Sequence, residues 1–217
     1  MQLQVAPSIL SADFANLGKD IEMLNGCADF IHLDVMDGTF VPNISFGLPV
    51  IESVAKIASI PMDAHFMVVH PERWIERTAA LGVKMMSFHL EAAGRSSARI
   101  LGEIQAAGMK AGLVINPDVP VERLFPYIGK ADFFLIMSVF AGFGGQKFIY
   151  EAIDRVAALR KELDKRGSRA PIEVDGGVGK GNAAALAEAG ASIVVAGSSV
   201  FKSADPVKAV SELQNPR

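Results

Sequence analysis

Residues 30–36, FIHLDVM, form an apolar run with the length of a buried strand, and this run points to the fold. Successive side chains of a strand lie on opposite faces, so His32, Asp34 and Met36 share one face. A strand that only fills a core has no reason to place an imidazole and a carboxylate side by side. The stretch therefore predicts a buried strand that has functional side chains on one face.

Strand-length runs of this kind recur along the chain, at 3–9, 61–67, 84–90, 110–116, 132–139, 171–176 and 192–197. Longer segments with helical periodicity lie between them, at 12–26, 71–82, 95–108, 151–167 and 181–190, and most end at a glycine, as a left-handed helix C-cap requires. Alternating apolar strands and helices are typical of a parallel sheet that helices cover. About eight such units predict an α/β fold of the (β/α)8 TIM-barrel class, with residues 1–217 as a single domain. An open doubly wound sheet is the alternative.

The composition narrows the class of protein. A chain of 217 residues with 50% hydrophobic residues can bury one large core. The single cysteine, Cys27, excludes an intramolecular disulfide and fits a reducing cytosol, so we expect a cytoplasmic protein. No signal peptide and no membrane span is predicted, and the scattered basic residues argue against a nucleic-acid surface. The net charge of −3 means that any phosphorylated ligand must be held by local geometry.

The predicted strands end in polar and sulfur-containing side chains. In a TIM barrel the active site is built at the carboxyl ends of the strands, so these residues are expected to meet at one mouth. They are Ser8, His32, Asp34, Met36, His65, Met67, His89, Glu91, Asn116, Met137, Ser138, Asp175, Gly197 and Ser198.

Four of these residues suit a divalent metal ion. His32, Asp34, His65 and Asp175 offer nitrogen and oxygen ligands of the kind that Zn²⁺, Fe²⁺, Mn²⁺ or Co²⁺ accept. Each has another explanation, since a single strand histidine can be a core residue and a single aspartate can cap a loop. Burying two carboxylates without a cation is costly, however, and no lysine or arginine stands at these strand ends. The sequence therefore predicts one metal site at the mouth.

Glycines gather after the last three strands, in AGFGGQ at 141–146, DGGVG at 175–179 and AGSSVF at 196–201. Loops in this part of a TIM barrel often bind phosphate through backbone N–H groups. Glycine permits the positive φ angles and the close approach that such loops need. The three turns therefore predict a phosphate site, although turns contain glycine for other reasons too.

Four motifs resemble those of the ribulose-phosphate 3-epimerase family: APSILSADF at 6–14, HLDVMDGTFVPN at 32–43, AGFGGQKFI at 141–149 and EVDGGV at 173–178. The resemblance extends over essentially the whole chain. It implies a ribulose-phosphate-binding TIM barrel, a metal-dependent isomerase of the pentose phosphate pathway. The reaction implied is the interconversion of D-ribulose 5-phosphate and D-xylulose 5-phosphate through a cis-enediolate.

The resemblance also implies roles for individual residues. The metal ligands would be His32, Asp34, His65 and Asp175, with Asp34 and Asp175 as the acid/base pair. The sugar and its phosphate would be bound by Ser8, His65, Gly142, Phe143, Gly144, Gly145, Gly176, Gly177, Gly197 and Ser198. The methionines Met36, Met67 and Met137 would form an apolar ring beside the reacting carbon, although each could equally fill a gap in the core.

Some features leave alternatives open. Family members usually carry Asn and Pro where this chain has Phe140 and Ala141, so a six-carbon substrate, as in D-allulose-6-phosphate 3-epimerase, is the alternative. A metal-free phosphate-binding barrel and a non-catalytic sugar-phosphate binder are more distant possibilities. We interpret Asp37 as shaping the turn after its strand and His89 and Glu91 as supporting residues. A homo-oligomer is expected.

Overall fold

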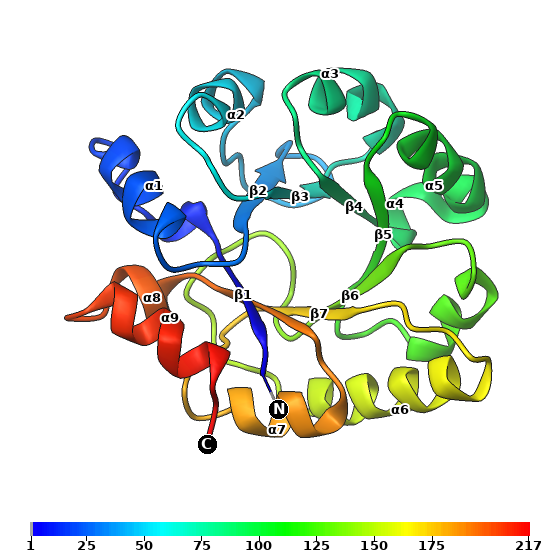
Figure 1. The fold of residues 1–217 in the computed structure, drawn as a ribbon. Helices are drawn as coiled ribbons and strands as arrows, with labels where there is room; N and C mark the ends of the chain where they lie inside the picture. The colour runs from blue at the N-terminus through cyan, green and yellow to red at the C-terminus, as the bar shows by residue number, and fades with distance from the viewer. Residues whose placement is uncertain (1) are drawn as a thin grey trace.

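The computed structural model describes residues 2–217, in which eight parallel strands form one nearly closed barrel surrounded by helices (Figure 1). The strands are β1 (Gln4–Pro7), β2 (Ile31–Met36), β3 (Met62–Met67), β4 (Met85–His89), β5 (Lys110–Ile115), β6 (Phe133–Met137), β7 (Ile172–Asp175) and β8 (Ile193–Ala196). Their order in the sheet is β1-β8-β7-β6-β5-β4-β3-β2, and a single parallel bridge between Ser8 and His32 joins the first strand to the second. The predicted (β/α)8 barrel is confirmed, and the open sheet is excluded.

Helices follow the strands and cover the outside of the barrel. The α-helices are α1 (Leu17–Asn25), α2 (Leu48–Ala55), α3 (Ile75–Ala80), α4 (Leu90–Ala93), α5 (Ser97–Ala106), α6 (Glu151–Lys165), α7 (Ala183–Ala189), α8 (Ser198–Phe201) and α9 (Pro206–Gln214). Short 3-10 helices are η1 (Ile9–Ser11), η2 (Pro71–Trp74), η3 (Gly94–Ser96) and η4 (Val121–Tyr127). The connection from β5 to β6 is made by η4, which contains Pro126. None of the helices described in residues 2–217 is long and apolar enough to cross a membrane.

The helix-ending glycines behave as predicted at four of five positions. Gly82, Gly108, Gly167 and Gly190 have φ angles between 67° and 105°, in the region that favours glycine. The prediction is wrong at Gly26, where φ is −90° and α1 closes in an ordinary right-handed turn.

The inside of the barrel changes from apolar to ionisable along its axis. Met85, Phe133 and Ile193, each the first residue of its strand, form an apolar cluster with Ala6 and Val195. Gly112 leaves room for the aromatic ring there, because a Cβ at this position would lie 2.2 Å from Phe133 Cζ. Towards the carboxyl ends of the strands the interior instead contains buried histidine and carboxylate side chains. The apolar plug therefore gives a rigid floor to a polar mouth.

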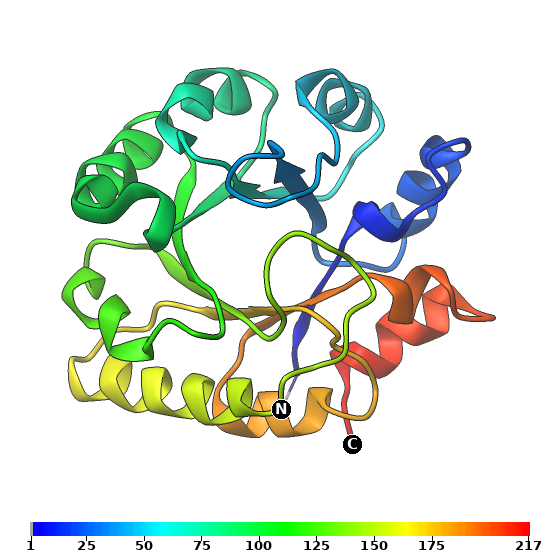
Figure 2. The same cartoon turned by 180° about the vertical axis from the view of Figure 1, so that it is seen from behind.

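Two loops meet over this mouth. The segment after β6 arches across the end of the barrel in Figure 2. Asn43 Nδ2, in the loop after β2, donates a hydrogen bond to Gly142 O at 3.1 Å.

Asp37 Oδ1 accepts from the amides of Thr39 and Phe40, each at 2.8 Å, as expected of a residue that shapes the turn.

Candidate active site

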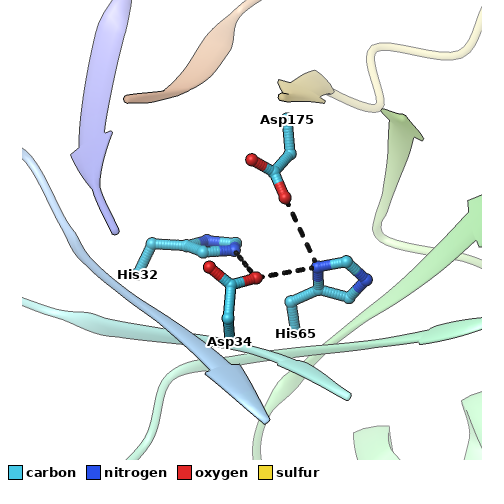
Figure 3. A group of neighbouring side chains, drawn as sticks. All are labelled: His32, Asp34, His65 and Asp175. Carbon is cyan, nitrogen blue, oxygen red and sulfur yellow. Dashed lines mark ion pairs between the residues drawn. The ribbon is translucent and has the colours of Figure 1, made fainter. Parts of the chain in front are cut away.

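Figure 3 shows the four predicted metal ligands pointing at one another inside the barrel mouth. Parallel pairing places Asp34 of β2 directly beside His65 of β3, while Asp175 approaches from the end of β7. One donor atom of each of the four residues lies within 4.8 Å of the others. Asp34 Oδ1 is 3.5 Å from His32 Nε2 and 3.4 Å from His65 Nδ1. Asp175 Oδ2 is 3.6 Å from His65 Nδ1. Side chains from three strands thus meet around one point.

The two imidazoles fit a metal ion because each presents a bare nitrogen to that point. His32 Nε2 and His65 Nδ1 are buried and have no hydrogen-bond partner among residues 2–217, whereas the other nitrogen of each ring is hydrogen-bonded. Buried polar atoms without partners are rare and costly. The 3.4–3.6 Å separations also resemble those around a tetrahedral ion, for which bonds of about 2.0–2.2 Å place donor atoms roughly 3.3–3.6 Å apart. The cluster could therefore hold a divalent metal ion.

The two aspartates differ in their electrostatic environment. Burial opposes ionisation of Asp34, but the adjacent His32 and His65 outweigh it and hold the pKa of Asp34 well below its usual range. Burial and then the charge of Asp34 raise the pKa of Asp175. Two carboxylates whose pKa values are pushed apart can divide the roles of base and acid.

A second acidic layer lies directly beneath His32. Asp63 Oδ2 is 2.7 Å from His32 Nδ1, and Glu173 Oε1 is 3.6 Å from the same nitrogen. Both carboxyl groups are essentially inaccessible to solvent. Burial, followed by the charge of Asp63, raises the pKa of Glu173 to about 8. The Asp63–His32 pair is the arrangement that fixes the tautomer of a metal-binding histidine.

The sequence interpretation gave Asp63 and Glu173 no role, although the signal was present. Each stands two residues before a predicted ligand, His65 or Asp175, and therefore on the same face of its strand.

A cleft above this cluster contains most of the other predicted site residues. Its walls include Ser8, Asp34, Asp175, Met36, Met67, Met137, Gly142, Phe143, Gly144, Gly145, Gly176, Gly177, Gly197 and Ser198. Ser8 Oγ donates a hydrogen bond to Asp34 Oδ2 at 2.5 Å. His65 is fully buried below the cleft surface, so its contact with the sugar stays a prediction. The part of the cleft wall that residues 2–217 form contains no lysine or arginine.

Backbone geometry explains two of the cleft glycines. Gly177 has a φ angle of +62°, and a Cβ there would lie 2.7 Å from Phe148 N. Gly197 has an ordinary φ, but its Cβ would lie 2.6 Å from Ser11 Oγ. These glycines allow the loops after β6, β7 and β8 to pack closely against η1 and one another.

Two further polar residues of the cleft wall were not predicted as site residues, Ser11 and Gln146. Gln146 Nε2 donates to Phe140 O at 2.7 Å and to Phe143 O at 2.8 Å, which closes the loop after β6 on itself. The position of Ser11 depends on packing against a distant part of the chain, at Gly197, whereas Gln146 is held within its own loop.

Comparison with known proteins assigns the family. The sequence profile described as "Ribulose-phosphate 3 epimerase family" matches residues 4–201. The chain is 43% identical over 217 residues to "Ribulose-phosphate 3-epimerase" of Bacillus subtilis (strain 168), covering 99% of this chain and 100% of the relative. The chain belongs to the ribulose-phosphate 3-epimerase family. This assignment confirms the resemblance seen in the sequence motifs and places the chain among the isomerases that act on carbohydrates.

A second relative agrees with this assignment, and solved structures of other enzymes share the barrel fold. A cytoplasmic isoform of ribulose-phosphate 3-epimerase from Oryza sativa subsp. japonica is 40% identical, covering 97% of this chain and 92% of the relative. A mutant tryptophan synthase α-subunit from the hyperthermophile Pyrococcus furiosus has a TM-score of 0.69 at 17% identity, with 98% and 94% of the two chains covered. A 3-hexulose-6-phosphate synthase also scores 0.69 at 20% identity, covering 99% and 98%. At this identity the two structures support the barrel fold alone.

Proposed function

We propose that this chain is a metal-dependent 3-epimerase that interconverts D-ribulose 5-phosphate and D-xylulose 5-phosphate. The observation that carries the proposal is the meeting of two carboxylates, Asp34 from β2 and Asp175 from β7, with two bare imidazole nitrogens at the floor of the cleft. The names of the relatives favour the five-carbon substrate.

His32, Asp34, His65 and Asp175 would hold the divalent ion, with Zn²⁺, Fe²⁺, Mn²⁺ and Co²⁺ as the candidates. When bound, the ion supplies positive charge that stabilises the developing oxyanion of the substrate. Without that charge, the two buried aspartates would repel an anionic intermediate.

The two aspartates carry the proton transfers. In the direction from ribulose to xylulose, Asp34 removes the proton at C3 from one face of the substrate, giving a cis-enediolate. Asp175 returns a proton to C3 from the opposite face, and the roles are exchanged in the reverse direction. The low pKa of Asp34 and the raised pKa of Asp175 support this division. Ser8 orients the first carboxylate through its hydrogen bond to Asp34 Oδ2.

The rest of the cleft would bind and shield the substrate. The phosphate would be held by backbone N–H groups of Gly142, Phe143, Gly144, Gly145, Gly176, Gly177, Gly197 and Ser198, because the cleft wall formed by residues 2–217 offers no cationic side chain. Met36, Met67 and Met137 form an apolar wall that excludes water beside C3.

The proposal is tested by incubating the enzyme with D-ribulose 5-phosphate in D₂O. We expect D-xylulose 5-phosphate with deuterium at C3, and loss of both conversion and exchange after chelation that is restored by added metal. Exchange that persists without metal would contradict the proposed mechanism. Faster turnover of D-allulose 6-phosphate would instead favour the six-carbon substrate, and binding without turnover would favour a sugar-phosphate binder.

Two wider expectations accompany this function. A reducing cytoplasmic location agrees with the single half-buried Cys27, and a homo-oligomer remains a prediction. Sedimentation of the purified protein would give the number of subunits.

A further inference from the structure

A row of polar contacts runs from His65 away from the cleft. His65 Nε2 lies 2.9 Å from His89 Nε2, and both imidazoles are fully buried. On the far side of His89, its Nδ1 lies 3.5 Å from Glu91 Oε1, and the Glu91 side chain is 25% exposed. Two imidazoles and a carboxylate thus connect the proposed metal site to the barrel rim.

The geometry at His65 determines where the protons of this row lie. A metal-binding nitrogen must carry a lone pair, so His65 with Nδ1 towards the ion has its proton on Nε2. That N–H then donates to His89 Nε2, which must be bare. An imidazole whose Nε2 is bare carries its single proton on Nδ1, so the fully buried ring of His89 has its N–H on the side away from His65.

The group placed to accept from His89 Nδ1–H is Glu91, whose Oε1 lies 3.5 Å from this nitrogen. The other neighbour of this nitrogen is Asn116 Nδ2 at 3.4 Å, which is itself a donor. Asn116 Nδ2 already donates to Glu91 Oε1 at 2.9 Å, and Asn116 Oδ1 accepts from the amide of Ala141 at 3.0 Å. The carboxylate is therefore the group able to accept from His89, and Asn116 holds it in place.

We propose that Glu91 is a positioning residue which, acting through His89, keeps His65 in the tautomer that presents Nδ1 to the metal. The inference rests on the proposed metal dependence. It means that the second histidine ligand, like the first, is held in place by a carboxylate. His32 is held by Asp63 directly, whereas His65 is held by a carboxylate through an intervening imidazole. Removing a partner of this kind from a metal-binding histidine typically weakens metal binding by about 10–100-fold.

The test measures Co²⁺ affinity by chelator competition, together with the absorption spectrum of the bound ion. Glu91→Gln should weaken Co²⁺ binding about tenfold, at the lower end of the usual range because Glu91 is partly exposed. The matched control is Glu72→Gln, because Glu72 lies 3.4 Å from exposed His70 with the same spacing along the chain. It should leave the affinity unchanged.

A double variant tests whether Glu91 acts through His89. In a His89→Phe background, Glu91→Gln should cause no further loss of Co²⁺ affinity, because the row is already interrupted. Equal tenfold losses in both backgrounds would overturn the proposal, as would an unchanged affinity in Glu91→Gln alone. Circular dichroism of the metal-free variants serves as the folding control.

A measurement on the unaltered protein keeps the test independent of any variant that fails to fold. Nitrogen-15 NMR of the Zn²⁺-loaded enzyme should show protonated Nε2 on His65 and protonated Nδ1 on His89. A proton on His89 Nε2 would overturn the inference even if metal binds normally. If the unaltered protein binds no metal at all, the proposed function fails instead, so the two failures are distinguishable.

Discussion

The two halves of the barrel contribute to the cleft in different ways. Strands β1 to β4 bring polar and ionisable side chains to the mouth, among them Ser8, His32, Asp34 and His65. Strands β5 to β8 mainly bring backbone, in glycine-rich loops, and Asp175 is the one carboxylate from this half that reaches the cleft wall described in residues 2–217.

Under the proposed function, the difference reflects what each half would bind. Proton transfer and metal ligation need atoms fixed to within fractions of an ångström, and strand pairing supplies this, as in the register of Asp34 beside His65. A phosphate group needs several N–H donors in a curved loop, and glycine permits that curvature. Asp175 is the exception because, in the proposed mechanism, one acid faces the other across the substrate.

The largest effect on activity is expected when Asp175 is replaced, because this removes the carboxylate that the second half brings to the described cleft wall. Asp175→Asn should lower epimerisation by at least about 10³-fold, because a group that delivers the proton in the transition state is lost. Exchange of the C3 proton of D-ribulose 5-phosphate with solvent should fall far less, because Asp34 still removes and returns a proton on its own face. Both rates can be followed by proton NMR in D₂O. Equal losses of exchange and epimerisation in Asp175→Asn protein that still binds its metal ion would contradict the two-base mechanism.

The next largest effect is expected from Asp63, the carboxylate that holds His32 in the first half of the barrel. Asp63→Asn should weaken Co²⁺ binding by about 10–100-fold, because an amide can donate to His32 Nδ1 and drive its proton onto Nε2. Asp132→Asn is the matched control. Asp132 accepts from Ala111 N at 2.8 Å at the opposite end of the barrel, and its replacement should not alter metal affinity. Comparable losses in both variants would mean that a general loss of packing, and not the tautomer of His32, weakens the site.

The sequence predicted the first half of the cleft better than the second. Strand side chains alternate strictly, so the shared face of His32 and Asp34 followed from their spacing alone, and an eight-unit barrel brought His65 and Asp175 to the same end. The depth of a residue along the barrel axis was harder to infer. Asp63 and Glu173 occupy the correct faces but lie one layer below the cleft, and nothing in their local sequence distinguishes the two layers.

The second half depends on contacts between distant loops. The glycines indicated sharp turns, and Gly177 indeed has a positive φ. That Ser11 lies against Gly197 could not be predicted, because it depends on how the loop after β8 packs against η1. Likewise, Gln146 closes its own loop through two carbonyl groups that carry no signal in the sequence.

A smaller effect is expected from a glycine that the backbone requires. Gly177→Ala should destabilise the protein by about 1–3 kcal/mol, because alanine is strained at a φ of +62° and its Cβ would lie 2.7 Å from Phe148 N. For a chain of this size that corresponds to a melting temperature lowered by roughly 2–4 °C per kcal/mol. The Michaelis constant should also rise as the loop is displaced. A variant with unchanged melting temperature and kinetics would show that the loops after β6 and β7 adapt, and that the second half is not pre-formed.

The smallest effect should come from Gly144, which lines the cleft but has no structural need to be glycine. A Cβ there would meet only Leu10 Cδ2 at 3.7 Å and Ser11 Oγ at 3.8 Å, which are ordinary contacts. Gly144→Ala should therefore leave the melting temperature unchanged, and any effect on catalysis must come from the substrate. If the backbone of this loop approaches the phosphate closely, the added methyl group should raise the Michaelis constant several-fold and weaken competitive inhibition by inorganic phosphate, with turnover nearly constant. Unchanged phosphate inhibition would place the phosphate nearer to the loops after β7 and β8, where Gly177 and Gly197 supply the donors.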